Sequence, residues 1–279
     1  MATPAGEPDE KGFDLLLRCL AVPEPTVLPP LAEAFHRAAD AGGAPFEVIA
    51  GAPFRRYGAR VTFRPTGEAG SLAAAFGLDS HPWGDPTWVG IRVRPDGSVQ
   101  AKAYHRLEGS LGRLDGRFVL PPGLPAGLRP VMAALHEGSR ELYLRLGPAA
   151  PSWTSFAAAV GAALEMNGIE KDLPFSPPPR PAEDGFCLSL RWQDGALTTL
   201  SLFADQRSLP GDGEIRRAWP EGMDETDRNA YEAALAAVRG LGRLPPSHAW
   251  HGMLAWTLEL SPEGSGFWHR AASLRVPPL

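Results

Sequence analysis

Lysine is scarce in this sequence: among 279 residues it occurs only as Lys11, Lys102 and Lys171, and arginine supplies the other basic side chains. The net charge of −5 argues against a general binder of nucleic acid or anionic membranes, so any anion site must be a local concentration of basic residues. Cysteine occurs only as Cys19 and Cys187, which excludes a disulfide framework and fits a reducing cytoplasm. No apolar run approaches the length of a membrane span.

The signatures of several enzyme classes are missing as well. There is no P-loop, no glycine fingerprint for dinucleotides and no Gly-x-Ser-x-Gly elbow. His248 and His251 have the spacing of metal ligands but lack a third ligand nearby, so we predict no metal site. Residues 1–11 are acidic and lack the apolar core of a signal peptide. We therefore expect residues 1–11 to be disordered, residues 12–279 to form one domain, and the protein to be cytoplasmic.

Pairs of alternating strand-like runs recur along the chain, each joined by a short turn. The clearest pair joins 87–94 to 98–107 through Asp96-Gly97, a strong hairpin signal. Four further hairpins are predicted: 46–50 with 59–64, 129–135 with 140–146, 186–192 with 196–203, and 252–260 with 267–276. The segment 131–135 is also compatible with a helix, and that alternative stays open.

Amphipathic helices alternate with these hairpins. The apolar spacing predicts helices over 13–20, from residue 31 to the glycines at 42–43, and over 71–77, 152–167 and 224–239. Hairpins interleaved with such helices imply an α+β fold in which one antiparallel sheet carries helices on one side. About ten strands are enough to close into a barrel, which removes exposed edges. We predict a closed, ten-stranded antiparallel β-barrel ringed by helices.

Basic side chains gather on the polar faces of the predicted strands. In the strand around Lys102, side chains alternate, so Lys102, Tyr104 and Arg106 share one face. If the barrel closes, basic side chains gather in one chamber suited to a diphosphate. These residues are Arg60, Arg64, Lys102, Arg106, Arg145, Arg191, His269 and Arg275, with Tyr104 and Tyr143 beside them. If the sheet stays open, the same face is solvated.

Further residues on this face suit an aromatic or prenyl group and the chemistry on it. The predicted pocket residues are Ile49, Thr62, Cys187, Ser189, Thr199, Ser201, Phe203, Trp256, Phe267 and Ser273. For any one aromatic, Trp256 above all, a core position is the default interpretation, and the pocket position is weighed against it. Glu47, Glu141 and Glu259 lie at interior positions, where a carboxylate can orient an acceptor and take its proton. We rank Glu259 and Glu47 first as the catalytic group.

Four segments are similar to motifs of the ABBA-type aromatic prenyltransferases of secondary metabolism. They are the Lys-x-Tyr strand at 97–104, the start of the third hairpin at 127–131, the strand and glycine turn at 190–195, and residues 258–262. The resemblance covers about 31–276, mostly as the order and spacing of hairpins. It implies a barrel of repeated αββα units. It also implies transfer of a prenyl group from dimethylallyl or geranyl diphosphate to a small electron-rich aromatic acceptor, with Lys102 and Tyr104 on the diphosphate.

The same resemblance implies that no Mg²⁺ or other cofactor is required. The family's metal-binding Asp falls at Thr62, and its small neighbour falls at Arg64. The family's Arg of the fourth hairpin falls at Thr199, with Arg191 across the turn, and a family Lys falls near His269. We expect a monomer with no nucleic-acid or membrane partner. Two alternatives stay open: a non-catalytic barrel that binds a small anionic or amphiphilic ligand, and an interaction protein whose polar strand face is solvated.

Overall fold

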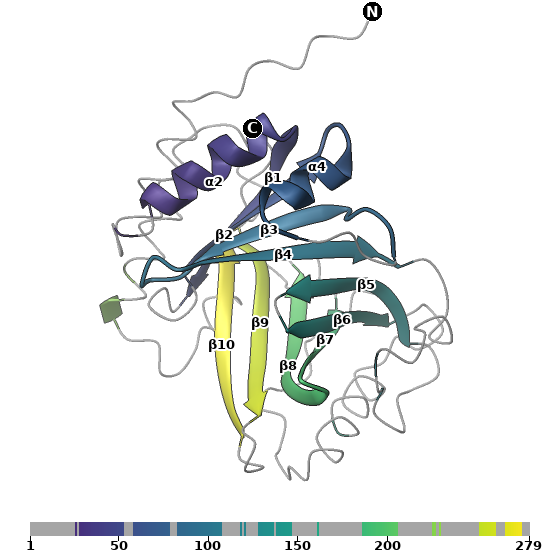
Figure 1. The fold of residues 1–279 in the computed structure, drawn as a ribbon. Coiled ribbons are helices and arrows are strands. Elements are labelled where there is room, and N and C mark those ends of the chain that lie inside the picture. The colour runs from purple at the N-terminus through teal and green to yellow at the C-terminus, as the bar shows by residue number, and fades with distance from the viewer. Residues whose placement is uncertain are drawn as a thin grey trace, which may run out of the picture. The chain divides into compact units, whose positions relative to one another are not determined.

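The computed structural model describes residues 26, 28–52, 58–78, 83–107, 118, 120, 128–136, 138–146, 161, 186–205, 225, 226, 229, 251–260 and 266–274 (Figure 1). The chain divides into two compact units. Unit 1 comprises residues 1–101, 220–252 and 272–279, and unit 2 comprises residues 102–219 and 253–271. Helices and antiparallel hairpins confirm the predicted α+β class. Closure of the strands into a ten-stranded barrel and a single domain over 12–279 stay predictions.

The described part of unit 1 holds a small antiparallel sheet together with helices α2 and α4. Its elements are α2 (Leu28–Asp40), β1 (Gly43–Ala52), β2 (Ala59–Pro65), α4 (Ala69–Ala75) and β3 (Trp88–Val93). Strand β1 pairs with β2, and β2 pairs with β3. The end of β10 (Gly266–Leu274) pairs with β1. Helix α2 packs on β1 and β3 and touches α4 (Figure 1). The predicted first hairpin is confirmed.

Helix α2 begins three residues before its predicted start. Pro29 and Pro30 lie in its first turn, where proline is tolerated because the first backbone N–H groups of a helix have no helical acceptor. The buried face carries Leu31, and the neighbouring Phe35 ring meets Phe63 of β2 edge-on with 5.1 Å between ring centroids. The helix ends at Asp40, and Gly42 follows with a φ of 73° that favours glycine. The predicted end of this helix at the glycines at 42–43 is confirmed.

The turn between β3 and β4 (Val99–Arg106) is the predicted Asp-Gly turn. Gly97 has a φ of 79°, and its N–H donates to the carbonyl of Arg94 over 2.9 Å. The Asp96 carboxylate accepts a hydrogen bond of 2.9 Å from the N–H of Ser98. The Asp-Gly pair therefore fixes the turn that precedes β4, the strand of Lys102.

Unit 2 is built on one antiparallel sheet. Its strands are the part of β4 from Lys102 onward, β5 (Leu128–His136), β6 (Ser139–Leu146), β7 (Phe186–Gln193), β8 (Ala196–Asp205) and most of β9 (His251–Leu260). Each of these strands pairs with the next in chain order. Asp194 and Gly195, with φ of 51° and 84°, form the two-residue turn between β7 and β8. The predicted third and fourth hairpins are confirmed.

Segment 131–135 lies in strand β5, so its helical alternative is wrong. Its residues pair with β6 on one side, and residues 132–135 also pair with β4 on the other. The hydrogen bonds of two neighbouring strands thus outweigh the helical propensity of Met132, Ala133, Ala134 and Leu135. Gly138, with a φ of 65°, makes the tight turn between His136 and Ser139 that sets this register.

Both faces of β6 are buried. Leu142 and Leu144 on one face are fully buried, and Glu141 and Tyr143 on the other face are each 7% exposed. On β7, Ser189 lies on the polar face and is 1% exposed. A solvated polar face is therefore excluded for this part of the sheet, which removes the main support for the interaction-protein alternative.

The remaining sequence predictions fall largely outside the described residues. The helix predicted at 13–20 lies wholly outside them. Of the helices predicted at 152–167 and 224–239, the described residues Gly161, Glu225, Thr226 and Asn229 are helical. In the described part of the chain, no helix is long and apolar enough to cross a membrane.

The core of unit 1 offers a test of the packing. Ile91 of β3 is fully buried opposite Val61, whereas Val99 of β4 is 50% exposed. We expect Ile91→Val to lower the free energy of unfolding by about 1 kcal/mol, because it removes a buried methylene group. Val99→Ala removes more atoms, yet we expect less than about 0.5 kcal/mol from it, because the site is on the surface. Urea unfolding followed by circular dichroism measures both. Equal effects would contradict the assigned faces of these strands.

Candidate active site

The register of unit 2 aligns the polar residues of six strands in three rows on one face of the sheet. Residues directly opposite each other in antiparallel strands project from the same face. The Glu141 row comprises Tyr104, Ala134, Glu141, Arg191, Thr199 and Glu259. The Tyr143 row comprises Arg106, Met132, Tyr143, Ser189, Ser201 and Thr257. The Arg145 row comprises Arg129, Arg145, Cys187, Phe203 and Ala255.

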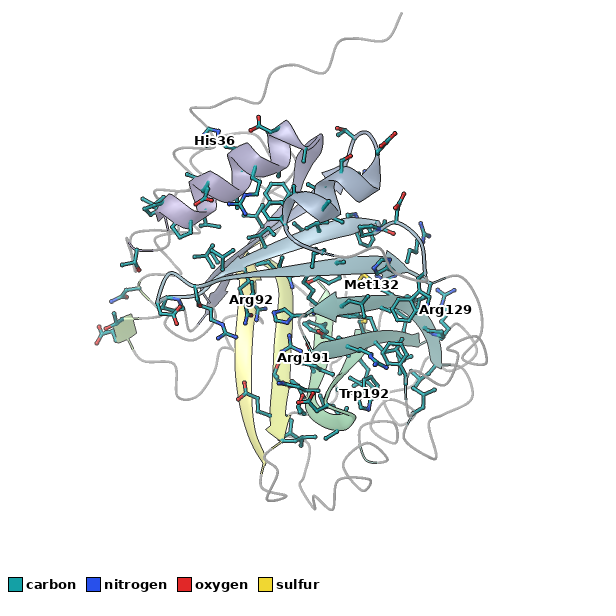
Figure 2. All side chains as sticks on the ribbon, viewed as in Figure 1. His36, Arg92, Arg129, Met132, Arg191 and Trp192 are labelled. Carbon is teal, nitrogen blue, oxygen red and sulfur yellow. The ribbon has the colours of Figure 1, made fainter. Side chains whose placement is uncertain are left out.

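Glu141 is the centre of the polar contacts on this face. Its Oε2 accepts a hydrogen bond from the ammonium of Lys102, and the two groups form an ion pair. Its Oε1 accepts a hydrogen bond of 2.5 Å from the hydroxyl of Ser189. Arg191, labelled on β7 in Figure 2, places its Nε 3.9 Å from Oε2. Three strands, β4, β6 and β7, therefore meet through this one carboxylate.

These contacts keep Glu141 ionised. Burial by itself raises the pKa of this carboxyl, because its side chain is only 10% exposed. The positive charges of Lys102 and Arg191 outweigh burial, and hydrogen bonds from Lys102 and Ser189 add to their effect. The net result lowers the pKa of Glu141 from 4.5 to about 2. At neutral pH the site thus contains a fixed negative charge between two fixed positive charges.

The ammonium of Lys102 is also held by aromatic side chains. It donates a hydrogen bond of 3.1 Å to the hydroxyl of Tyr143. It lies 5.1 Å from the ring centroid of Tyr104 and 5.4 Å from that of Tyr143, within the range of cation–π attraction. The Lys102 side chain is 14% exposed. Its charge is therefore held in a fixed place by a carboxylate, a phenol and two rings.

Three aromatic rings line this face beside the lysine. The ring centroids of Tyr104 and Tyr143 are 6.2 Å apart, and those of Tyr143 and Phe203 are 6.0 Å apart. The series runs from the Glu141 row through the Tyr143 row to the Arg145 row. Such π faces can stabilise a carbocation that is shielded from water.

Smaller polar groups complete the face. The hydroxyls of Ser201 and Thr257 are 3.0 Å apart, within hydrogen-bonding distance. Cys187 is a free thiol. Burial raises its pKa to about 12, although the charge of Arg145 opposes that shift. The Cys187 thiol is therefore neutral and weakly nucleophilic at physiological pH, and it contributes to this face as a small apolar side chain.

Comparison with protein-family models and with curated protein sequences found no match. Among solved structures, the 6-dimethylallyltryptophan synthase from Micromonospora olivasterospora, solved with DMASPP and Trp, is 14% identical over 98% of this chain and 100% of that one, with a TM-score of 0.59. The 5-dimethylallyltryptophan synthase from Streptomyces coelicolor is 17% identical over 94% and 96%, with a TM-score of 0.60. The prenyltransferase PriB is 15% identical over 96% and 95%, with a TM-score of 0.56.

The chain has the prenyltransferase fold. The resemblance inferred from its hairpin order and from the Lys-x-Tyr strand is thereby confirmed at the level of the fold. Sequence identities of 14–17% carry no residue roles, so the roles of individual side chains have to rest on the geometry of this chain.

Within the prenyltransferase fold, most predicted site residues of unit 2 share the face described above. They are Lys102, Tyr104, Arg106, Tyr143, Arg145, Cys187, Ser189, Arg191, Thr199, Ser201, Phe203 and Glu259. Arg106 is exposed, whereas Arg145 is half-buried. Their grouping on one face was predicted correctly, and their functions stay predictions.

The predicted residues of unit 1 are described in less detail. On β2, Thr62 is buried, Arg60 is half-buried and Arg64 is exposed. The register of β1 pairs Glu47 with Thr62 and Ile49 with Arg60, although the side chains of β1 at these positions are not described. The functions predicted for all five residues stay predictions.

Strands β9 and β10 hold the remaining predicted residues. Phe267, His269 and Ser273 lie in β10, where only the backbone is described, and Arg275 lies outside the described residues. The register pairs Trp256 with Leu202, one step out of phase with the pairs formed by Thr257 and Glu259. The side chain of Trp256 is not among those described, so both its predicted place in the pocket and its alternative place in the core stay predictions.

The position of Glu141 at the centre of the polar contacts is the feature that the sequence interpretation did not predict, whereas the ranking of the catalytic group stays a prediction. Glu141 was one of three interior carboxylates, and Glu259 and Glu47 were placed ahead of it. A signal was present, because Glu141 and Tyr143 share one strand face and Lys102 lies on another predicted interior strand. In the described part of the chain, no three His, Cys, Asp or Glu side chains gather as a metal site.

Proposed function

We propose that this protein is an aromatic prenyltransferase that moves a prenyl group from an allylic diphosphate to a small electron-rich aromatic acceptor. The observation that carries the proposal is the part-buried ammonium of Lys102 in a chain with the prenyltransferase fold, where Tyr104, Tyr143 and Phe203 line the same strand face. This arrangement combines positive charge for a leaving diphosphate with π faces for an allylic cation.

In the proposed reaction, the bond between the allylic carbon and the diphosphate oxygen breaks, and diphosphate leaves with the bonding electrons. The leaving diphosphate carries roughly three negative charges, one of which develops as the bond breaks, and this charge needs fixed positive charges nearby. Lys102, Arg145 and Arg191 supply such charges on one face of unit 2. We assign the diphosphate to this side of the site, with the hydroxyl of Tyr143 as a further donor.

The allylic cation then forms a new bond to the acceptor ring, and the ring loses a proton to restore its aromaticity. The rings of Tyr104, Tyr143 and Phe203 are proposed to shelter the cation from water. Glu259, opposite Thr199 in the Glu141 row, and Glu47, opposite Thr62, are proposed to orient the acceptor and accept its proton. The fold neighbours solved with DMASPP and Trp make dimethylallyl diphosphate and an indole the first donor and acceptor to test.

Closure of the strands into a ten-stranded barrel belongs to this proposal, as does transfer without a metal ion. Thr62 stands where the resemblance predicts a metal-binding Asp, and arginine and lysine can neutralise a diphosphate directly. Geranyl diphosphate is the longer donor that the same site is proposed to accept.

The test is titration calorimetry of the full chain with dimethylallyl and geranyl thiodiphosphates in the presence of EDTA, followed by a transfer assay with tryptophan and simple phenols. We expect micromolar binding of at least one thiodiphosphate without metal, and a prenylated product detected by mass spectrometry. Binding that needs Mg²⁺ would contradict metal independence alone. Absence of binding with either EDTA or Mg²⁺ would contradict the enzyme assignment.

One observation favours a second candidate, a non-catalytic module that binds a small anionic or amphiphilic ligand. Glu141 already neutralises part of the charge of Lys102, which leaves less positive charge for a diphosphate than the basic residues alone provide. Tight binding of thiodiphosphates with no product from any acceptor would favour this second candidate.

A further inference from the structure

Glu141 places a negative charge among the cations that the proposed function assigns to the diphosphate. Lys102 pairs with its Oε2, Arg191 lies 3.9 Å from the same oxygen, and Ser189 occupies Oε1. The side chain is 10% exposed, so solvent screens this charge poorly. The Glu141 carboxylate therefore lies beside the two positive charges that would attract an incoming anion, and it reduces that attraction.

The lysine does not depend on Glu141 alone for its position. A lysine ammonium carries three N–H donors, and the described residues accept two of them from Lys102, at Glu141 and at the hydroxyl of Tyr143. The rings of Tyr104 and Tyr143 hold the same ammonium by cation–π attraction. Loss of the carboxylate charge should therefore leave Lys102 near its present place while removing its nearest anion.

We propose that Glu141 is an internal counter-ion, a residue that acts through Lys102 and Arg191 by offsetting part of their positive charge and thereby sets a modest affinity of the site for diphosphate. This inference rests on the proposed assignment of Lys102 to the diphosphate. When an anion binds, Lys102 shares its donors between the anion and Glu141, and the nearby carboxylate repels the anion. The same repulsion favours departure of the diphosphate product.

The test compares Glu141→Gln with the wild-type chain by titration calorimetry, with inorganic pyrophosphate as the probe and EDTA present. We expect the dissociation constant of pyrophosphate to fall by about tenfold in Glu141→Gln, because a fixed like charge is removed beside the anion. Glu33→Gln is the matched control. Glu33 pairs with Arg37 on the exposed surface of α2, so its removal should leave the affinity unchanged.

A second readout separates a counter-ion from an ordinary structural group. Without pyrophosphate, Glu141→Gln should melt at a lower temperature than the wild type, because two cations lose their buried partner. Saturating pyrophosphate should raise its melting temperature by more than it raises that of the wild type. A merely structural glutamate would give the first effect without the second.

If Glu141→Gln does not fold, Glu141→Asp is the second variant. Aspartate keeps the negative charge but is one methylene group shorter, which moves the charge away from Lys102. We therefore expect Glu141→Asp to bind pyrophosphate more tightly than the wild type does. Equal or weaker pyrophosphate binding by the variants would overturn the inference, as would no binding by any of them. The proposed enzyme is tested separately by prenyl transfer in the wild type, so product formation together with weaker binding by Glu141→Gln would reject the counter-ion alone.

Discussion

Replacement of Lys102 by methionine is expected to lower kcat/KM for prenyl transfer by about a thousandfold. Methionine keeps the unbranched apolar stem that lies against Tyr104 and Tyr143 but removes the ammonium. Removal of one preorganised hydrogen-bond donor from an oxyanion hole lowers kcat by a factor of about 10² to 10³, and we expect loss of a charged donor beside a leaving diphosphate to have an effect of this size. The effect should be at the upper end here, because Lys102 supplies the charge in a part of the site that is largely buried.

The measurement is steady-state transfer from dimethylallyl diphosphate, with Lys102→Arg as the control. Arginine keeps the charge but differs in shape, so we expect a loss of about tenfold. Lys102→Met should also lower the free energy of unfolding by roughly 1–3 kcal/mol, because Glu141 loses its closest cation while Arg191 and Ser189 remain. A fully folded Lys102→Met protein with unchanged kcat/KM would remove Lys102 from the mechanism.

Turn chemistry and alternation were sufficient to predict most of the hairpins. Asp96-Gly97 and Asp194-Gly195 mark turns that need positive φ, and the structure places φ values of 79°, 51° and 84° at Gly97, Asp194 and Gly195. Alternation also assigned Glu141 and Tyr143 to one face and Leu142 to the other. These are local properties, because each depends on residues close together in the chain.

The partners across strands could not be predicted in the same way. Lys102 and Glu141 are 39 positions apart, and which residues oppose each other depends on the register of every strand between them. That register shifts at two irregularities in unit 2, between Pro130 and Met132 on β5 and, opposite Arg191 and Trp192, between Leu197 and Thr199 on β8. A single extra residue at either place changes the row in which a side chain lies. The contacts of Glu141 with Lys102 and Arg191 could not be predicted without this information.

The acid stability of the protein should reveal Glu141 independently of any ligand. The pKa of Glu141 is lowered from 4.5 in the unfolded chain to about 2 in the folded one. A carboxyl with a lowered folded pKa contributes stability that is fully present above its unfolded pKa and is lost as the pH falls through the folded pKa. The window for this loss is therefore between about pH 5 and pH 2, and the contribution at neutral pH is about 3 kcal/mol.

We expect the free energy of unfolding of the wild type to exceed that of Glu141→Gln by about this amount at pH 7, and the difference to shrink steadily below pH 5. Urea unfolding at a series of pH values measures it. All other carboxylates titrate in both proteins, so their contributions cancel in the difference, which isolates the pairing of Glu141 with Lys102 and Arg191. A difference in the free energy of unfolding between the two proteins that stays constant down to pH 3 would mean that Glu141 contributes through packing. In that case its charge would stabilise neither cation, and the electrostatic argument for an internal counter-ion would fail even if the fold and the transfer activity stood.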